Sequence, residues 1–228
     1  MYTYFLLHIA TVAFPLLRSF EGKIAYYKKW KPLFAALFIT ASLFILWDHY
    51  FTTWGVWSFN KQYIIGTYIL KLPVEEWLFF ITVPFSCLFI YEALNYYIKK
   101  DYLKPIATPV TIILVATLTI TAFLHLQQWY TSVTFFTAAL CLLLHYMFFG
   151  NQLLGRFYMA YLVHLIPFFI INSVLTSLPI VIYNNEKNLG IRLGTIPIED
   201  TIYSLILLLI NISLYEYFKK VFHKSYDN

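Results

Sequence analysis

Charged residues are scarce in this chain. Asp, Glu, Lys and Arg together make up 12% of its 228 residues, whereas a soluble globular domain carries about 25%. Hydrophobic residues reach 61% and aromatic residues 21%, and the mean hydropathy is +0.68. This composition excludes an ordinary soluble domain and predicts an integral membrane protein.

Motifs that would hold metals or nucleotides are also missing. The two cysteines, Cys87 and Cys141, lie in apolar segments without metal-ligand spacing, so we expect both to be packing residues. No Gly-x-Gly-x-x-Gly stretch occurs, so no Rossmann nucleotide site is predicted. The net charge of +5 arises from basic residues in short loops, a pattern that sets membrane orientation. We therefore expect no metal, no cofactor and no nucleic-acid partner. Four histidines fall singly on different apolar runs and are expected to be packing residues: His8, His125, His145 and His164.

Seven apolar runs follow one another along the chain. Each approaches the ~20 residues that a helix needs to cross the hydrocarbon, although the first is short. The runs lack the alternation of barrel strands, so we predict helices. The first run has no basic residues ahead of it, so we expect a retained span rather than a cleaved signal peptide. The expected spans are about residues 2–17, 33–51, 74–97, 106–126, 130–149, 157–178 and 198–218.

Basic residues are distributed unevenly between the two ends of these spans. The richer face should be cytoplasmic, so we expect an N-terminus outside and a C-terminus inside a bacterial inner membrane. The twelve on the richer face are Arg18, Lys23, Lys28, Lys29, Lys31, Lys99, Lys100, Lys104, Arg156, Lys219, Lys220 and Lys224. The four on the opposite face are Lys61, Lys71, Lys187 and Arg192.

The chain also matches itself. A shift of 124 residues aligns special and polar residues without a gap: Asn60 with Asn184, Gly66 with Gly190, Pro73 with Pro197, Glu75 with Glu199, and Tyr91-Glu92 with Tyr215-Glu216. The shift carries the first three spans onto the last three and keeps their direction. We therefore expect an all-α integral membrane protein with about seven transmembrane helices. They would form two parallel three-helix repeats, residues 1–98 and 130–228, joined by a linker helix within 99–129.

Each predicted repeat places acidic residues at the mouth of its third span. Residues 73–76 read Pro-Val-Glu-Glu and residues 197–200 read Pro-Ile-Glu-Asp. Proline followed by acids is also an ordinary helix start, which is the structural alternative. Two copies in register at the ends of bilayer helices favour function, because carboxylates are costly to bury there. The predicted catalytic residues are Glu75, Glu76, Glu199 and Asp200.

Burial determines what such acids can do. A low dielectric favours the neutral carboxyl and can move a pKa by up to about 3–5, which outweighs the roughly 0.3–1 kcal/mol by which a helix dipole favours the charged form. A protonated carboxyl is a general acid, and an ionised neighbour can act as the base. Aromatic faces stabilise cations by about 2 kcal/mol or more once water is excluded, although each aromatic alone also fits an interfacial belt. The set suits protonation of an apolar alkene, cation rearrangement and proton loss.

The paired motifs, the Asn before each and the Trp47-Asp48 pair resemble the small membrane lycopene cyclases. The resemblance covers nearly the whole chain and matches the fused form of the heterodimeric bacterial enzymes. The cyclase domain of fungal bifunctional carotenoid enzymes is also similar. The resemblance implies ring closure at the ψ-ends of a linear carotene such as lycopene, held in the bilayer beside membrane lipid, to give β- or ε-rings.

The two halves differ in the residues around these motifs. The second half has Ile171-Asn172 in place of Trp47-Asp48, which leaves open whether both repeats are catalytic. Arg192 stands where the first half has Tyr68. The expected substrate-binding residues are Asn60, Asn184, Trp47, Asp48, Trp54, Trp57 and Arg192.

Two other function classes remain open at this point. A membrane prenyltransferase handles similar isoprenoids, but no Asn-x-x-x-Asp or Asp-x-x-x-Asp spacing for Mg²⁺ and diphosphate is found. A transporter or receptor also suits seven helices in parallel repeats, but no lysine within a span is placed for a retinal Schiff base. The sequence leaves open the ring type, the number of ends cyclised, the carotene length, the proton donor and the oligomeric state.

Overall fold

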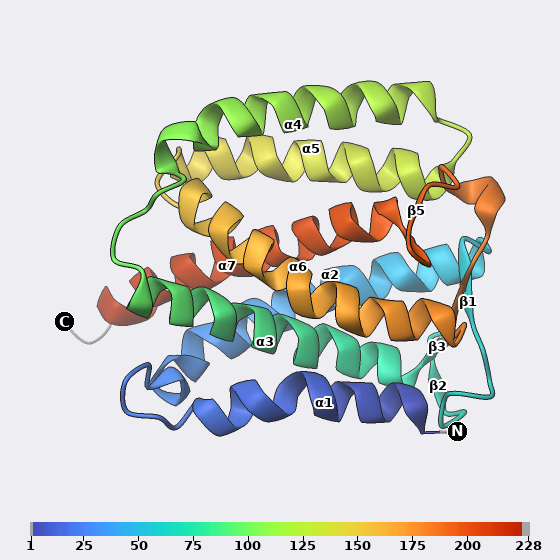
Figure 1. The fold of residues 1–228 in the computed structure, drawn as a ribbon, viewed down its shortest axis with the longest axis horizontal. Helices are drawn as coiled ribbons and strands as arrows, with labels where there is room; N and C mark the ends of the chain where they lie inside the picture. The colour runs from blue at the N-terminus through green and yellow to red at the C-terminus, as the bar shows by residue number, and fades with distance from the viewer. Residues whose placement is uncertain (1, 225–228) are drawn as a thin grey trace.

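The computed structural model describes residues 2–224 (Figure 1). Met1, residues 225–228 of the predicted second repeat, and the side chain of Lys224 lie outside the described part. The described helices are α1 (Thr3–Arg18), α2 (Trp30–Thr53), α3 (Val74–Tyr97), α4 (Lys104–Leu124), α5 (Trp129–Phe149), α6 (Leu154–Ser177) and α7 (Ile198–Lys224), with 3₁₀ turns at Tyr26–Lys29 and Asn185–Lys187. The described strands are β1 (Trp57–Phe59), β2 (Tyr68–Ile69), β3 (Leu72–Pro73), β4 (Val181–Tyr183), β5 (Arg192–Leu193) and β6 (Ile196–Pro197).

The helices coincide with the expected spans to within about three residues, except that α7 continues to Lys224, beyond the expected end at 218. Six of the seven described helices, α2 to α7, are long and apolar enough to cross a membrane. The exception is α1, whose 16 residues fall short of the ~20 that a perpendicular span needs. The protein is therefore an all-helical integral membrane protein with at least six candidate spans.

The helices lie side by side along the long axis of the molecule (Figure 1). α1 packs against α3, α5 packs against both α4 and α7, and α2 packs against α7 in the centre. The labelled strands and the N-terminus lie at one end of the bundle, and the C-terminal end of α7 lies at the other. Both acidic motifs begin helices at the end that carries the strands.

Backbone hydrogen bonds recur at the spacing of 124 residues that the sequence indicates. A short hairpin, β2–β3, precedes α3, and the corresponding hairpin, β5–β6, precedes α7. The N–H of Val74 donates to the carbonyl of Thr67 at 2.9 Å, and the N–H of Ile198 donates to the carbonyl of Ile191 at 3.0 Å. Equivalent residues of the two acidic motifs thus enter their helices through the same local structure.

Strands β1 and β4 form an antiparallel pair between the two halves of the chain. Ser58 lies opposite Ile182, the residue 124 positions later. The pair is flanked by two 2.9 Å bonds related by the same spacing, from the Asn60 N–H to the Ile180 carbonyl and from the Asn184 N–H to the Val56 carbonyl. This pair therefore joins equivalent segments across a local two-fold relationship.

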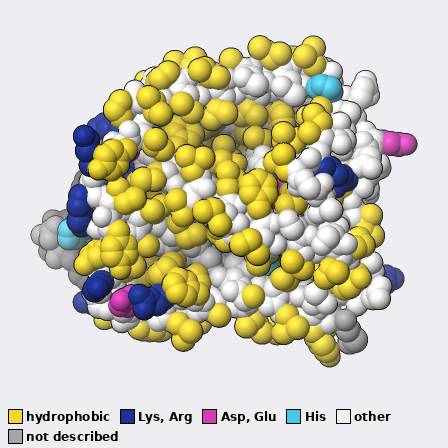
Figure 2. Space-filling view, viewed as in Figure 1, with side chains coloured by type: hydrophobic (Ala, Val, Ile, Leu, Met, Phe, Trp, Pro, Cys, Tyr) yellow, Lys and Arg dark blue, Asp and Glu magenta, His cyan; other side chains and the backbone are white. Residues whose placement is uncertain are grey.

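Lys and Arg side chains gather at the end of the molecule opposite the acidic motifs, while the middle of the visible surface is largely hydrophobic (Figure 2). At the basic end, the Tyr91 hydroxyl donates to Glu216 at 3.2 Å and the Tyr215 hydroxyl donates to Glu92 at 2.7 Å. Lys219 donates to both glutamates, at 2.9 Å to Glu216 and 3.2 Å to Glu92. These reciprocal bonds link α3 to α7, so the two helices that carry the acids are held together at their far ends.

Candidate active site

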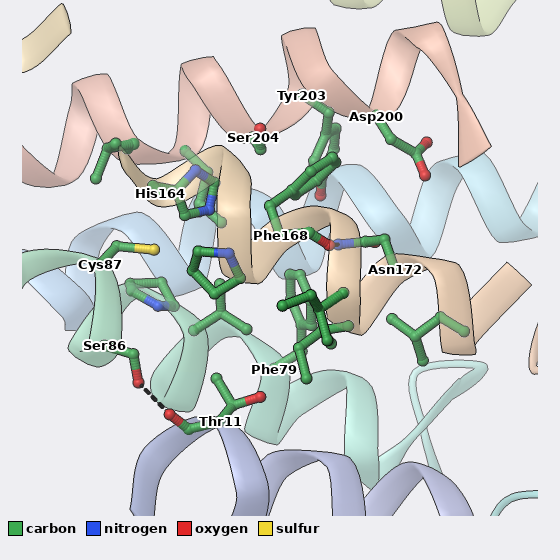
Figure 3. A pocket seen from close by; sticks show the side chains of 18 of the residues that line it. Thr11, Phe79, Ser86, Cys87, His164, Phe168, Asn172, Asp200, Tyr203 and Ser204 are labelled. Carbon is green, nitrogen blue, oxygen red and sulfur yellow. Dashed lines mark hydrogen bonds between the residues drawn. The ribbon is translucent and has the colours of Figure 1, made fainter. Parts of the chain in front are cut away.

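A cavity of about 420 Å³ lies between α1, α3, α6 and α7. Figure 3 shows Phe79 and Cys87 of α3 and Phe168 of α6 around this space, with Asp200 and Tyr203 reaching it from α7. Most of the lining is apolar. Carboxyl groups line it only toward the end that carries the strands, among the residues that the structure describes.

The acids begin helices because a proline stops the strand before each of them. Pro73 ends β3 and Pro197 ends β6, and a residue without a backbone N–H is tolerated at a helix start, where that donor has no partner in the helix. Pro73 keeps an extended backbone, with φ −63° and ψ 150°. Successive helical residues then lie about 100° apart around the axis. Neighbouring acids must therefore face different surroundings.

The first acid of each motif holds the preceding loop. Glu75 is fully buried, and its Oε1 accepts a 2.6 Å hydrogen bond from the N–H of Ile65. Glu199 is equally buried, and its Oε1 accepts bonds from the N–H of Leu189 at 2.8 Å and from the Thr131 hydroxyl at 2.6 Å. In both residues Oε2 has no hydrogen-bond partner within residues 2–224. Neither side chain lines the described cavity.

The second acid of the first motif does line the cavity, beside a carboxyl from another helix. Glu76 accepts a 2.6 Å hydrogen bond from the Tyr4 hydroxyl of α1. Asp48 of α2 accepts a 2.6 Å bond from the Tyr203 hydroxyl of α7. The Asp48 and Glu76 side chains also lie within hydrogen-bonding range of each other. Two carboxyl groups at that range share a proton readily, because two ionised carboxylates would repel each other.

The second acid of the second motif, Asp200, is held differently. Its Oδ1 accepts a 2.5 Å bond from the Tyr130 hydroxyl of α5, and its Oδ2 accepts a 2.8 Å bond from the Tyr183 hydroxyl of β4. Burial and the neighbouring Asp200 raise the pKa of Tyr183 well above its ordinary value. The phenol therefore stays protonated and donates. Two donated hydrogen bonds favour the ionised form of the carboxylate that accepts them.

Aromatic rings surround these carboxyl groups. Trp57 lies 5.2 Å from the Tyr130 ring, edge to face, and 6.2 Å from the Tyr203 ring, measured between centroids. Phe59 of β1 and Phe79 of α3 line the same space. Aromatic rings that line a largely apolar cavity can stabilise a positive charge on an apolar ligand when a ring face meets it.

The structure brings together four of the eleven predicted site residues. Asp48, Trp57, Glu76 and Asp200 line the cavity, whereas Glu75 and Glu199 hold loops as described above. The other five lie outside the described lining. Trp47 packs on Phe44 and Tyr203, and Trp54 packs on Tyr50 and Trp129 at the surface.

The remaining three bond to neighbouring loop residues. Asn60 accepts a hydrogen bond from the Gln62 N–H, and Asn184 accepts one from the Glu186 N–H. Arg192 donates to the Thr195 carbonyl and to the Asn185 side chain.

Sequence reasoning missed the residues that hold the acids in place. Tyr183 directly precedes Asn184, and Tyr203 lies three residues after Asp200, so their closeness to predicted site residues could have indicated them. Tyr4 and Tyr130 lie 72 and 70 residues from the acids they bond, and nothing local indicates those pairings. His164, expected to be a packing residue, also lines the cavity, and its Nδ1 has no hydrogen-bond partner among the described residues. His8 and His145 do pack, with hydroxyl partners at 3.0 and 2.7 Å.

The site can therefore donate a proton to an apolar ligand and remove another. The described residues contain no group of three or more His, Cys, Asp or Glu arranged to hold a metal ion.

A model of the family described as lycopene cyclase matches residues 1–94 and 127–218. The unmatched interval contains all of α4. Comparisons with curated proteins and with solved structures found no match.

Proposed function

The chain belongs to the lycopene cyclase family, and from that premise we propose that it closes rings at the ψ-ends of lycopene by redox-neutral acid–base catalysis. The observation that carries the proposal is the convergence of Asp48, Glu76 and Asp200, each hydrogen-bonded to a tyrosine, at one end of an apolar cavity. An apolar polyene fits the walls, and the carboxyl groups supply what the chemistry requires. This family membership makes the chain an enzyme of carotenoid biosynthesis in the membrane.

The proposed reaction moves one proton in and one proton out. The proton shared by Asp48 and Glu76 adds to the terminal double bond of the ψ-end and leaves a tertiary cation. A double bond of the same chain attacks this cation, so one carbon–carbon bond forms and the charge moves into the new ring. Asp200 then removes a proton from a ring carbon next to the cationic carbon, which restores a double bond. Loss from one of the two neighbouring ring carbons gives a β-ring, and loss from the other gives an ε-ring. Substrate and product are isomers, so no oxidant or reductant is consumed.

Hydrogen bonding supports this division of roles between the carboxyl groups. Asp200 accepts from two phenols, which favours a base that is ionised before the reaction. Asp48 and Glu76 each accept from one phenol and face each other, which favours a retained proton. General acid–base groups of this kind contribute about 10²–10⁴-fold each.

We also propose that the fold consists of two parallel repeats, residues 1–98 and 130–228, with α4 as the linker. The hydrogen bonds that recur at 124 residues and the family match on either side of α4 support this arrangement. In this arrangement α1 corresponds to α5 and is counted as a seventh, shorter span. The basic end would face the cytoplasm of a bacterium, which places both acidic motifs and the N-terminus at the outer surface.

Expression in a lycopene-accumulating bacterium, with the pigments separated by chromatography, tests the proposed function. The parent protein should yield monocyclic or bicyclic carotenes. Asp200→Asn should lower ring formation by about 10²-fold or more because the base is lost. Glu186→Gln, which changes an acid outside the cavity lining, is the matched control and should behave like the parent.

Two outcomes would contradict the proposal. Unchanged lycopene from a well-inserted parent would exclude this substrate. Ring formation that depends strictly on added flavin or nicotinamide would exclude the redox-neutral route.

A further inference from the structure

We propose that the cavity opens sideways into the lipid between α1 and α6, and that a linear carotene enters there with one end inside and the rest left in the bilayer. This inference rests on the proposed function for the identity of the ligand. It does not follow from the acids themselves, because it concerns the exposed residues of α1 and α6 in the cavity lining.

Exposure identifies the opening. Among the described residues that line the cavity, only four side chains are exposed, and all four belong to α1 or α6. Phe14 is 64% exposed and Ile170 is 63% exposed. A residue that both lines a cavity and reaches the outer surface must stand at its rim. We call this set the lateral opening: Ala10, Phe14, Pro167 and Ile170.

Depth decides what the lateral opening faces. Ala10 lies near the midpoint of α1, and Pro167 lies near the midpoint of α6. Both helices run between the two ends of the bundle (Figure 1), so their midpoints lie within the hydrocarbon rather than at either aqueous surface. A ligand dissolved in lipid can reach the cavity there without crossing water.

Packing leaves the two helices free to part. α1 is tied to α3 by the Tyr4–Glu76 bond and by the Ser86 hydroxyl, which donates to the Thr11 carbonyl at 3.0 Å (dashed in Figure 3). No side-chain hydrogen bond joins α1 to α6 within residues 2–224, and the two helices make few contacts. Pro167 also removes one backbone donor from the interior of α6, which weakens the helix locally.

Size indicates how much of the ligand the cavity holds. The lining follows α3 from Glu76 to Ile90, roughly 20 Å at 1.5 Å per residue. The volume of about 420 Å³ lies low in the ~300–1,000 Å³ range that encloses a drug-sized molecule, and a full-length carotene is longer and larger. One ψ-end can therefore sit at the acids while the other remains outside. A bicyclic product then requires release, reversal and a second entry.

Blocking the lateral opening in folded protein tests the proposal. Single substitutions Ala10→Cys and Ile170→Cys are made at the rim, and Leu6→Cys and Ile166→Cys serve as controls. The controls lie four residues away on the same helices, are 58% and 65% exposed, and are absent from the described lining. Each purified protein is treated with a bulky lipid-soluble pyrene maleimide, reconstituted, and assayed with lycopene. The parent, treated alike, controls for Cys87 and Cys141.

The expected result is a loss of ring formation of about tenfold or more after labelling at Ala10→Cys or Ile170→Cys, because access and position are both lost. The same extent of labelling at Leu6→Cys or Ile166→Cys should leave the rate close to that of the treated parent. The thermal unfolding midpoint of each variant, measured before labelling and compared with that of the parent, checks that the variant is folded. Equal rates for labelled rim and labelled control variants would overturn the lateral opening.

A second readout separates this inference from the proposed function. Bound lycopene should protect the two rim cysteines from the reagent and leave the control cysteines unprotected. If the parent forms no rings, the proposed function fails, and protection alone still decides whether a linear carotene occupies the opening. Equal labelling of rim and control cysteines with and without lycopene would overturn it.

Discussion

Adjacent acids in this protein face different surroundings, and the difference arises from the rotation of about 100° between neighbouring residues of a helix. Glu76 and Asp200 face the cavity, whereas Glu75 and Glu199 face the loops that precede their helices. In each motif the buried first acid accepts the N–H of a loop residue ten positions earlier. That arrangement places the second acid at the cavity wall.

Replacing Glu199 should reveal this loop-holding role. Glu199→Met leaves the Leu189 N–H and the Thr131 hydroxyl without their acceptor, which costs about 1–3 kcal/mol for each buried polar group left unpaired. We expect a lower midpoint of thermal unfolding in detergent. Glu199→Gln, which retains an acceptor oxygen, should unfold near the parent temperature and keep much of its activity. If both variants keep the parent midpoint but lose ring formation, Glu199 takes part in the chemistry.

Among the secondary-structure elements, the β1–β4 pair is short but contributes directly to the candidate site. It joins the two halves at the end that holds the acids, and it contributes Trp57 and Tyr183 to the cavity wall. Antiparallel pairs alternate between bonded and non-bonded positions. The backbone bonds from Asn60 to Ile180 and from Asn184 to Val56 therefore make the central Ser58–Ile182 position a bonded one.

Removing the donor at Ser58 should loosen this junction. Ser58→Pro lacks the N–H, and proline is not accommodated within a paired strand. We expect a lower unfolding midpoint together with reduced ring formation, because Tyr183 would no longer be held against Asp200. Ser58→Thr keeps the N–H and is the matched control. A Ser58→Pro protein with the midpoint and the rate of the parent would show that the pair does not position the site.

At the scale of the whole molecule, residues from both halves of the chain line one cavity. Asp48 and Glu76 come from the first half, and Asp200 and Tyr203 come from the second. α2 packs on α7, and α3 packs on α6, so the helices of each half are buried against those of the other. Neither half alone contains the proposed acid and the proposed base.

Cutting the chain after Leu126, in the turn between α4 and α5, should test this. We expect the two fragments to form rings when they are co-expressed in a lycopene-accumulating bacterium, because the contacts between halves do not depend on that turn. Each fragment expressed alone should form none. Ring formation by a single inserted fragment would contradict a shared site.

Prediction from sequence succeeded where the signal is local. Apolar runs located the helices, and the Pro-x-Glu motifs located the acids at one end, since both depend on neighbours in the chain. The tyrosines that bond the acids were not predictable, because Tyr203 reaches Asp48 across 155 residues. The lateral opening depends on the packing of α1 beside α6, which no periodicity reports. Sequence alone also could not tell which acid of each motif faces the cavity.

The bond between Tyr203 and Asp48 bears on how a duplicated chain could diverge. The positions equivalent to these two residues in the other half are Phe79 and Asn172. If the tyrosine is lost first, the aspartate loses this hydrogen-bond donor, whereas if the aspartate first becomes asparagine, the amide oxygen still accepts from the tyrosine. The second order is therefore the one we expect, so that a substitution in one half determines which substitution the other half tolerates.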